Sequence, residues 1–281
     1  MLLNSICVLS VLLGGVISFL SGMAYIHWLW LWPVSFAGCF LVLLGLAVGY
    51  LFYILSKVDM DTPVEHDDPK FRKIVGVYAH AFCTILGMRF HVTGLEKRPT
   101  EGRFLLVSNH LHEMDIPSLY FPFEKMQMSF VSKKENRDMF VVGKVMHQLA
   151  CPLMDRENNR EGLKTILKCV KLLEDDELSL CIFPEGYTSP DGHLQHFRPG
   201  ALKIATKAHV PIVVCTLQNT NKVVRNIKRL RHTDIEVHIL DVITPEQQVG
   251  KTTVELGEQI FRMMAEDLPA EYAPISENTE S

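Results

Sequence analysis

A histidine and an aspartate five positions apart, His110 and Asp115, are the side chains of this 281-residue chain best suited to chemistry. The apolar run 104–107 before His110 indicates a buried strand. Ile116 and Pro117 follow Asp115 and indicate the first turn of a helix, because proline is tolerated there. Residues five apart do not share a helix face. We therefore expect His110 in the strand-to-helix loop, with the Asp115 carboxylate folding back towards its imidazole.

Such a pair is suited to general-base catalysis. A carboxylate can hold one nitrogen of the His110 imidazole while the other nitrogen faces a substrate. A neutral imidazole titrates in the right range to accept a proton. The pair is half of a catalytic triad whose nucleophile is missing. The pattern therefore predicts that a hydroxyl group of the substrate is the nucleophile.

A second strand end carries a polar side chain of its own. The apolar run 180–183 leads directly into Pro184, Glu185 and Gly186. In open α/β sheets, ligands bind at the carboxyl edge of the strands. The Glu185 carboxylate is therefore a candidate for a ligand site. A simple turn with a solvated glutamate is the competing interpretation, and the stretch by itself does not separate the two.

Short apolar runs alternate with longer helical patterns through most of the chain. Strands are predicted at 89–93, 104–108, 128–132, 151–154, 178–183, 211–217 and 235–242. Helices are predicted at 116–123, 135–148, 160–174, 201–208 and 254–267. This alternation predicts an α/β domain with a mostly parallel sheet that is flanked by helices on both faces.

The first 56 residues contain no Lys, Arg, Asp or Glu. Two apolar runs, 2–25 and 33–55, are each long enough to cross a bilayer, and all three tryptophans lie between them, as interfacial aromatic residues do. We therefore expect an N-terminal two-helix transmembrane hairpin. A cleaved signal peptide would need a basic start and a small-residue cleavage site, neither of which is evident. A buried pair of core helices would usually carry some charge.

The sequence divides into four parts. Residues 1–57 form the hairpin, 58–88 an acidic linker and an amphipathic helix, 89–268 the α/β domain, and 269–281 a polar tail that we expect to be disordered. Basic residues begin at Lys57, so the positive-inside rule places the α/β domain on the cytoplasmic side of a cell membrane. The amphipathic helix is expected either to pack against the domain core or to lie on the membrane surface.

Charge and cysteine usage argue against other classes of protein. A net charge of −4 gives no support for nucleic-acid binding. The seven cysteines are scattered, which is typical of buried cytosolic thiols and not of a disulfide framework or a zinc site. The histidines and aspartate that could be drawn as a metal centre are His110, His112, Asp115, His193 and His196. Their spacing matches no metal motif, so we expect no metal.

Several blocks of this sequence, in order, resemble the glycerolipid acyltransferase family, which includes the lysophosphatidic acid acyltransferases. The first is Asn109-His110 with Asp115, and a later one is Phe183-Pro184-Glu185-Gly186. Between and after them, 131–135 with 152–156 resembles the second block of the family, and 210–213 resembles the fourth. One block alone would be a weak signal, whereas four in order indicate the family. The resemblance runs from about Phe90 to Val242.

The resemblance implies a membrane-bound O-acyltransferase of phospholipid synthesis. His110 would take the proton from the free hydroxyl of the acceptor, Asp115 would orient and polarise His110, and the hydroxyl would attack an acyl thioester. The thioester would be carried on coenzyme A or acyl carrier protein, with no other cofactor. The partners implied are therefore membrane lipids, a lysophospholipid and the thioester carrier. The residues implied to bind the phosphate side of the acceptor are Arg156, Glu185 and Gly186, with Lys133 as a further candidate.

The sequence departs from the family at Thr188. The family usually has Thr-Arg-Ser after Pro-Glu-Gly, whereas this chain has Tyr187-Thr188-Ser189, so an arginine that would anchor phosphate is absent. Arg198, or Lys203 one turn later, is the candidate to replace it. The expected acceptor is 1-acylglycerol 3-phosphate, which would give phosphatidate, and the alternative is another lysolipid or a lipid alcohol.

Two other classes remain as alternatives. A non-catalytic lipid-binding protein could be built on the same fold, but it would gain nothing from a histidine poised as a base. A metal-dependent lipid hydrolase would lose its activity with chelators.

Overall fold

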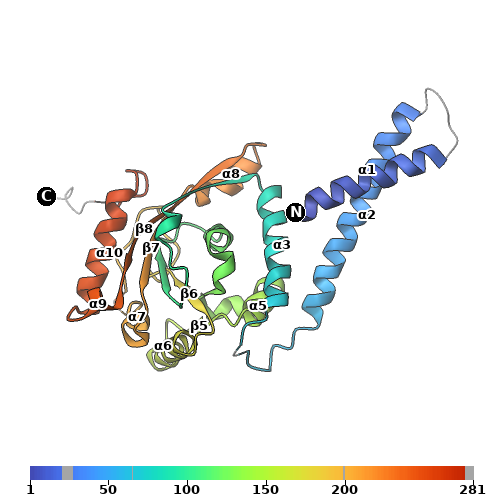
Figure 1. Cartoon of the computed structure of the whole chain (residues 1–281). Helices are drawn as coiled ribbons and strands as arrows, with labels where there is room; N and C mark the ends of the chain where they lie inside the picture. The colour runs from blue at the N-terminus through green and yellow to red at the C-terminus, as the bar shows by residue number, and fades with distance from the viewer. Residues whose placement is uncertain (21–27, 65, 199, 276–281) are drawn as a thin grey trace. The chain divides into compact units, whose positions relative to one another are not determined.

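The structure, a computed structural model, describes residues 1–20, 28–64, 66–198 and 200–275 (Figure 1). The chain forms two compact units. The first comprises Met1–Thr62 and Val77–Phe82, and the second comprises Pro63–Gly76 and Cys83–Ser281.

Two apolar helices make up most of the first unit: α1 (Leu2–Leu20) and α2 (Trp28–Ser56). Both are long and apolar enough to cross a membrane, as judged by length and composition. They pack closely, because a Cβ atom on Gly14 would lie only 3.0 Å from the backbone nitrogen of Phe36. The two expected apolar helices are therefore present. Residues 21–27, the end of the first apolar run and the start of the expected turn, lie outside the described residues.

The amphipathic helix is α3 (Pro69–Ile85). Its first half packs on the core of the second unit through Arg72, which is 5% exposed. The Arg72 guanidinium donates hydrogen bonds to both carboxylate oxygens of Asp67, to the carbonyl of Met128 at 2.6 Å and to the hydroxyl of Ser129 at 3.3 Å. A buried guanidinium is stable only when its donors are satisfied in this way. Packing against the domain core, one of the two expectations for this helix, is therefore right for this half.

A six-stranded sheet is the centre of the second unit. Its strands are β1 (Met88–Thr93), β2 (Leu105–Ser108), β3 (Met128–Phe130), β6 (Ser179–Ile182), β7 (Ile212–Gln218) and β8 (Thr233–Ile243). Their order in the sheet is β1-β8-β7-β2-β6-β3, and every neighbouring pair is parallel except β7 with β8. The expected mostly parallel sheet is therefore confirmed. A separate parallel pair consists of β4 (Ser132–Lys133) and β5 (Leu153–Met154).

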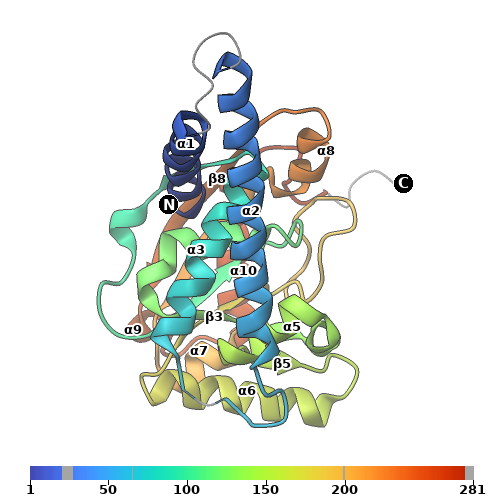
Figure 2. The same ribbon diagram turned by 90° about the vertical axis from the view of Figure 1, so that its right-hand side faces the viewer.

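Helices cover both faces of this sheet (Figure 2). The α-helices are α4 (Asp115–Tyr120), α5 (Phe140–Gln148), α6 (Asn159–Glu174), α7 (Lys203–Ala208), α8 (Val223–Ile227), α9 (Pro245–Gln248) and α10 (Thr253–Asp267). The short 3-10 helices are η1 (Leu95–Lys97), η2 (Phe121–Met126), η3 (Lys134–Asp138) and η4 (Thr220–Lys222).

Strand alternation divides the core into two apolar clusters. In β2, Leu105 and Val107 join the cluster that α6, α7 and α10 cover, whereas Leu106 joins the cluster that α4 and η2 cover. All four residues of β2 are fully buried, as expected for a strand with helices on both faces. The rigid centre of this sheet is what carries the loop with His110.

Two predicted helices are divided in the structure, and the strand predicted at 128–132 is divided into β3 and β4, which lie in different sheets. The helix predicted at 135–148 is divided into η3 and α5, with Met139 extended between them. Gly143 packs against this break, because a Cβ there would lie 2.0 Å from the carbonyl oxygen of Arg137. The helix predicted at 116–123 is α4 followed by η2, so its last residues are in a 3-10 helix.

The tail expected to be disordered from residue 269 begins with an ordered stretch. Tyr272 is 2% exposed, its hydroxyl donates to the Asn219 side chain at 3.0 Å, and its carbonyl accepts from the amide of Leu194 at 2.8 Å. A buried aromatic ring with a satisfied hydroxyl fixes this segment on the core. The disordered tail therefore does not start at 269, and residues 276–281 lie outside the described residues.

The buried ion pair of Arg72 with Asp67 generates a stability prediction. Arg72→Ala should lower the free energy of unfolding by about 3–5 kcal/mol, because it leaves the Asp67 carboxylate buried without its partner. The neighbouring Lys73 is exposed, and Lys73→Ala should change the free energy by no more than about 0.5 kcal/mol. Chemical unfolding of the full chain in detergent measures both. Equal effects of the two substitutions would contradict a structural role of Arg72.

Candidate active site

The two polar stretches meet because their strands are neighbours in the sheet. β2 and β6 pair in parallel with Val107 opposite Ile182, so their carboxyl ends lie side by side. The loop with His110 and the loop with Glu185 therefore leave the same edge of the sheet. A backbone hydrogen bond joins them, from the amide of Ser189 to the carbonyl of His110 at 2.8 Å.

Asn109 fixes the end of β2 to β7, the strand on the side opposite β6. Its side chain is fully buried, with the amide group donating to the carbonyl of Leu217 at 3.0 Å and the side-chain oxygen accepting from the amide of Leu217 at 2.7 Å. Both ends of a buried amide are thus satisfied by one backbone residue of β7. Sequence reasoning noted Asn109 only as part of a block, and its positioning role becomes visible only in the sheet.

Asp115 is fully buried and organises the loop after β2. Its Oδ2 accepts hydrogen bonds from the amides of Leu111 at 2.7 Å and His112 at 2.9 Å, and from Nδ1 of His110 at 2.7 Å. The predicted fold-back of the carboxylate onto the imidazole is therefore what the structure contains. Because Nδ1 donates to a carboxylate, the neutral ring carries its proton there and leaves the lone pair of Nε2 for another group.

The other ring nitrogen of His110, Nε2, faces Thr188. The Thr188 hydroxyl lies 3.1 Å from Nε2 of His110 and donates to it in this tautomer. The ring stacks on Phe183, with 4.1 Å between centroids and an angle of 13° between planes. A hydroxyl oxygen at hydrogen-bond distance from Nε2 occupies the place that the hydroxyl of a substrate would need for proton transfer. Thr188 was noticed in the sequence only as a departure, and Phe183 only as part of a block.

Glu185 is 1% exposed and makes backbone contacts. One carboxylate oxygen accepts from the amide of His110 at 2.6 Å, and the other accepts from the amide of Gln195 at 3.0 Å. Burial raises the pKa of this carboxyl to about 8. Both oxygens of Glu185 accept from the backbone, so the contacts seen here position His110. Binding of the acceptor by Glu185 stays a prediction.

Gly186 allows Arg198 to approach the loop. Its φ is +82°, which strains any residue with a side chain, and a Cβ there would lie 2.6 Å from Nε of Arg198 and would displace that side chain. Arg156 and Arg198 are both exposed residues, but partial removal of the Arg156 guanidinium from water lowers its pKa, and the positive charge of Arg198 lowers it further. Two predicted substrate-binding arginines from distant parts of the chain therefore lie near enough to repel each other. An anion bound between them would relieve that repulsion.

The remaining candidates are placed less centrally. Pairing of β4 with β5 sets Lys133 opposite Met154, two residues before Arg156, but Nζ of Lys133 lies 3.9 Å from the carboxylate of Glu135 and the side chain is half exposed. Lys203 is the exposed first residue of α7.

The other histidines considered for a metal centre face elsewhere. Nδ1 of His193 lies 2.7 Å from the carbonyl of Ala273, and His196 stacks on Phe261. His112 accepts a hydrogen bond from the amide of Met114 through Nδ1 at 3.3 Å. Within the described ranges, no three His, Cys, Asp or Glu side chains gather as metal ligands.

Comparison with known proteins agrees with this geometry. Residues 89–218 match the profile of the family described as Acyltransferase. The chain is 28% identical over 188 residues to a probable 1-acyl-sn-glycerol-3-phosphate acyltransferase of Mycoplasma pneumoniae, covering 65% of this chain and 70% of that protein. It is 26% identical over 198 residues to the 1-acyl-sn-glycerol-3-phosphate acyltransferase of Limnanthes douglasii, covering 70% and 69%.

A solved structure shares the fold. The crystal structure of the 1-acyl-sn-glycerophosphate acyltransferase PlsC from Thermotoga maritima superposes with a TM-score of 0.57 at 23% identity, covering 77% of this chain and 84% of that chain. The mostly parallel sheet with flanking helices is thus an arrangement that occurs in a known acyltransferase.

The buried carboxyl of Glu185 generates a pH prediction. Its pKa is raised from 4.5 to about 8 in the folded protein, so the folded state holds this proton more tightly than the unfolded chain. Its contribution to stability is therefore complete below about pH 4.5 and is lost as the pH rises through about 8. Glu185→Gln should be less stable at pH 5 by about 1–3 kcal/mol, because an amide nitrogen cannot accept from a backbone amide.

Between pH 5 and pH 8, the same variant should lose less stability than the original protein. Unfolding midpoints of the full chain at several pH values measure this difference. The exposed Glu258 provides the control, and the stability of Glu258→Gln should depend on pH in the same way as that of the original protein. If the stability of Glu185→Gln fell with pH as steeply as that of the original protein, Glu185 would not be the group that binds the proton.

Proposed function

Because this chain belongs to the glycerolipid acyltransferase family, we propose that it transfers a fatty acyl group from an acyl thioester to the free hydroxyl of 1-acylglycerol 3-phosphate. The products are phosphatidate and a free thiol. The observation that carries this proposal is the hydrogen bond between the buried Asp115 and the partly buried His110, with Nε2 of the imidazole directed at a hydroxyl group.

The reaction begins with proton transfer. The acceptor hydroxyl takes the place of the Thr188 hydroxyl at Nε2 of His110 and gives its proton to that nitrogen while its oxygen bonds to the thioester carbon. Asp115 stabilises the imidazolium that forms, because its Oδ2 already accepts a hydrogen bond from the N–H group at Nδ1. The carbonyl electrons move to oxygen, which gives a tetrahedral adduct.

The adduct then collapses with loss of the thiol. The carbonyl forms again, the carbon–sulfur bond breaks, and the proton on Nε2 of His110 passes to sulfur. A thiolate is a good leaving group, since thiols ionise near pH 8.5, and it needs little help from an acid. The pair of His110 and Asp115 therefore suffices for the proton movements, without a nucleophile from the protein.

The acceptor is proposed from two observations. Arg198 lies beside Gly186 and its charge acts on Arg156, and a guanidinium fork suits a phosphate dianion. Arg198 then supplies the charge that the arginine missing at Thr188 would have supplied. The names of the similar proteins from Mycoplasma pneumoniae and Limnanthes douglasii support the same acceptor. Thr188 itself favours the second candidate, in which the reaction is the same and the acceptor is another lysolipid or a lipid alcohol.

The proposed place of action is the cytoplasmic face of a membrane. α1 and α2 would span the bilayer, in which the acceptor and the product both remain. The basic residues that follow α2, beginning with Lys57, favour the cytoplasmic side for the second unit. Acyl-CoA or acylated carrier protein would then deliver the acyl group from the cytoplasm.

The base is tested by His110→Ala. Acyl transfer to 1-acylglycerol 3-phosphate should fall by about 10²–10⁴ in kcat, because the proposed general base is lost. Transfer from labelled acyl-CoA and from acylated carrier protein, in membranes that contain the full chain, measures the rate. His112→Ala should retain activity within about tenfold. If His110→Ala matches the original protein, or if no lysolipid in a broad panel is acylated, a lipid-binding function replaces this proposal.

The phosphate anchor is tested by Arg198→Gln. Loss of a charge-assisted contact should raise the KM for 1-acylglycerol 3-phosphate by about 10–100-fold, with a smaller change in kcat. Restoring the arginine of the family in the double variant Thr188→Arg with Arg198→Gln should recover part of that loss. Lys203→Gln is the matched control. A rise in KM with Lys203→Gln and none with Arg198→Gln would assign the anchor to Lys203.

A further inference from the structure

The connection between β7 and β8 carries a strongly basic segment, residues 223–231, which we call the basic turn. It consists of α8 and the four residues that follow it. No acidic residue occurs from 219 to 233. The cationic side chains of the basic turn are all exposed, and they are Arg225, Lys228, Arg229 and Arg231.

Ion pairs do not neutralise these four cations. On either side of the basic turn, Lys222 pairs with Glu271 at 2.9 Å and Asp234 lies 3.3 Å from Nε2 of His91. Neither pair includes one of the four cations, and none of the four forms an ion pair with a described residue. The basic turn therefore presents four uncompensated positive charges to solvent.

Hydrogen bonds fix the shape of the basic turn. The carbonyl of Asn226 accepts from the amides of Arg229 at 2.9 Å and Arg231 at 3.0 Å, and the Asn226 side chain donates to the hydroxyl of Thr233 at 3.0 Å. Leu230 lies between the two arginines with a φ of +53° and a side chain that is 96% exposed. A positive φ is uncommon for a residue of this kind. The fold thus holds a leucine in water, and a surface that covered it would gain free energy.

The basic turn extends from the edge of the sheet that carries the candidate active site. β2, β6 and β7 are parallel, so the segment after β7 leaves the same edge as the loops with His110 and Glu185. Gln218, the last residue of β7, is opposite Glu236, whereas β8 already begins at Thr233. The basic turn therefore extends beyond the end of β7 on the active-site edge.

Exposed apolar side chains accompany the cations at this edge. The carbonyl of Gly87 accepts from the amide of Thr233 at 3.0 Å, which brings the end of α3 next to the basic turn (Figure 1). Ile85 in the last turn of α3 is 56% exposed, and Val224 of α8 is 42% exposed. Apolar side chains among lysines and arginines are typical of segments that bind an anionic bilayer, where the cations contact phosphates and the apolar groups enter the headgroup boundary.

We propose that the basic turn docks on the surface of an anionic bilayer, with its cations at lipid phosphates and Leu230 in the headgroup boundary, and thereby directs the active-site edge of the sheet towards the membrane. The inference rests on the proposed function for the presence of a lipid acceptor in that bilayer. A soluble polyanion would neutralise the charges but would leave Leu230 in water. The exposed leucine therefore favours a bilayer over a soluble partner.

Hydrogen exchange of the full chain in nanodiscs tests this docking. Exchange at residues 223–232 should be slower in discs that contain phosphatidylglycerol than in discs of phosphatidylcholine alone, and high salt should remove the difference. The double variant Arg229→Gln with Arg231→Gln should reduce this protection by up to about 30-fold, because each cation near an anionic surface contributes about fivefold. Leu230→Asn should reduce it about tenfold and keep the shape of the turn, because asparagine tolerates a positive φ.

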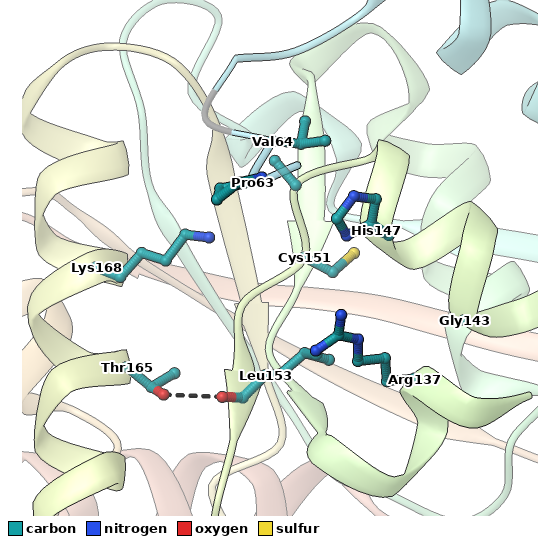
Figure 3. A pocket seen from close by; sticks show the side chains of 10 residues that line it. Pro63, Val64, Arg137, Gly143, His147, Cys151, Leu153, Thr165 and Lys168 are labelled. Carbon is teal, nitrogen blue, oxygen red and sulfur yellow. Dashed lines mark hydrogen bonds between the residues drawn. The ribbon is translucent and has the colours of Figure 1, made fainter. Parts of the chain in front are cut away.

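The matched control is the double variant Lys168→Gln with Lys207→Gln, at two exposed positions. Lys168 of α6 lines a pocket of about 220 Å³, and none of the described residues that line it belongs to the basic turn (Figure 3). Lys207 lies near the end of α7, before β7 begins, and so away from the edge at which β7 ends. The control should keep the protection of the original protein.

Four results would overturn the proposal. One is equal protection in both kinds of disc. Another is unchanged protection in the double arginine variant or in Leu230→Asn. A third is an equal loss in the lysine control, which would attribute the protection to overall charge. The last is protection in neutral discs by free coenzyme A or by acyl carrier protein, which would assign the basic turn to the acyl donor.

The outcome is separate from that of the proposed reaction. His110→Ala should lose acyl transfer and keep the dependence of exchange on phosphatidylglycerol. If no lysolipid is acylated by the original protein, the proposed reaction fails while the exchange result still decides whether the basic turn docks on the bilayer.

Discussion

The candidate site depends on one buried carboxylate oxygen. Oδ2 of Asp115 accepts from the imidazole of His110 and from two backbone amides of the same loop. Donors of this kind offset the cost of burying a carboxylate, and all three converge on Oδ2, while the buried Oδ1 has no hydrogen-bond partner among the described residues. The same contacts that stabilise the charge set the tautomer of His110 and turn Nε2 towards Thr188. Structural stability and chemical orientation are therefore the same requirement here.

The loop after β6 fixes His110 in the loop after β2. The Glu185 side chain accepts a hydrogen bond from the amide of His110, and the amide of Ser189 donates one to the carbonyl of His110. The ring of Phe183 stacks on the imidazole of His110. Contacts to the ring, the amide and the carbonyl of His110 leave the side chain little freedom to turn away from the orientation that proton transfer needs. Next to this rigid centre, Gly186 leaves room for Arg198, so that the proposed phosphate anchor comes from a neighbouring segment and not from the loop itself.

The proposed function gives the two units different tasks. Apolar helices α1 and α2 provide surface that water does not solvate, whereas the α/β unit keeps its polar chemistry on a buried sheet. The proposed acceptor stays in a bilayer, so the proposed reaction requires the α/β unit to meet it at the membrane surface.

Local rules were enough for much of this protein. The spacing of His110 and Asp115, with proline just after, predicted the fold-back of the carboxylate, and the fully apolar strands predicted a sheet covered on both faces. Two uncharged runs predicted two long apolar helices. Each of these depends on periodicity or on neighbours within a few residues, which a sequence displays directly.

Tertiary structure decided whatever depends on partners distant in the chain. A sequence does not show whether the Glu185 carboxylate faces a ligand or a backbone amide 75 positions away, and here it faces the amide. It does not show that Thr188 lies at Nε2 of His110, that Tyr272 is buried, or that β8 runs opposite to β7. The pairing of β2 with β6 and the packing around the sheet fix these contacts, because side chains from separate segments meet only once the strands are in register.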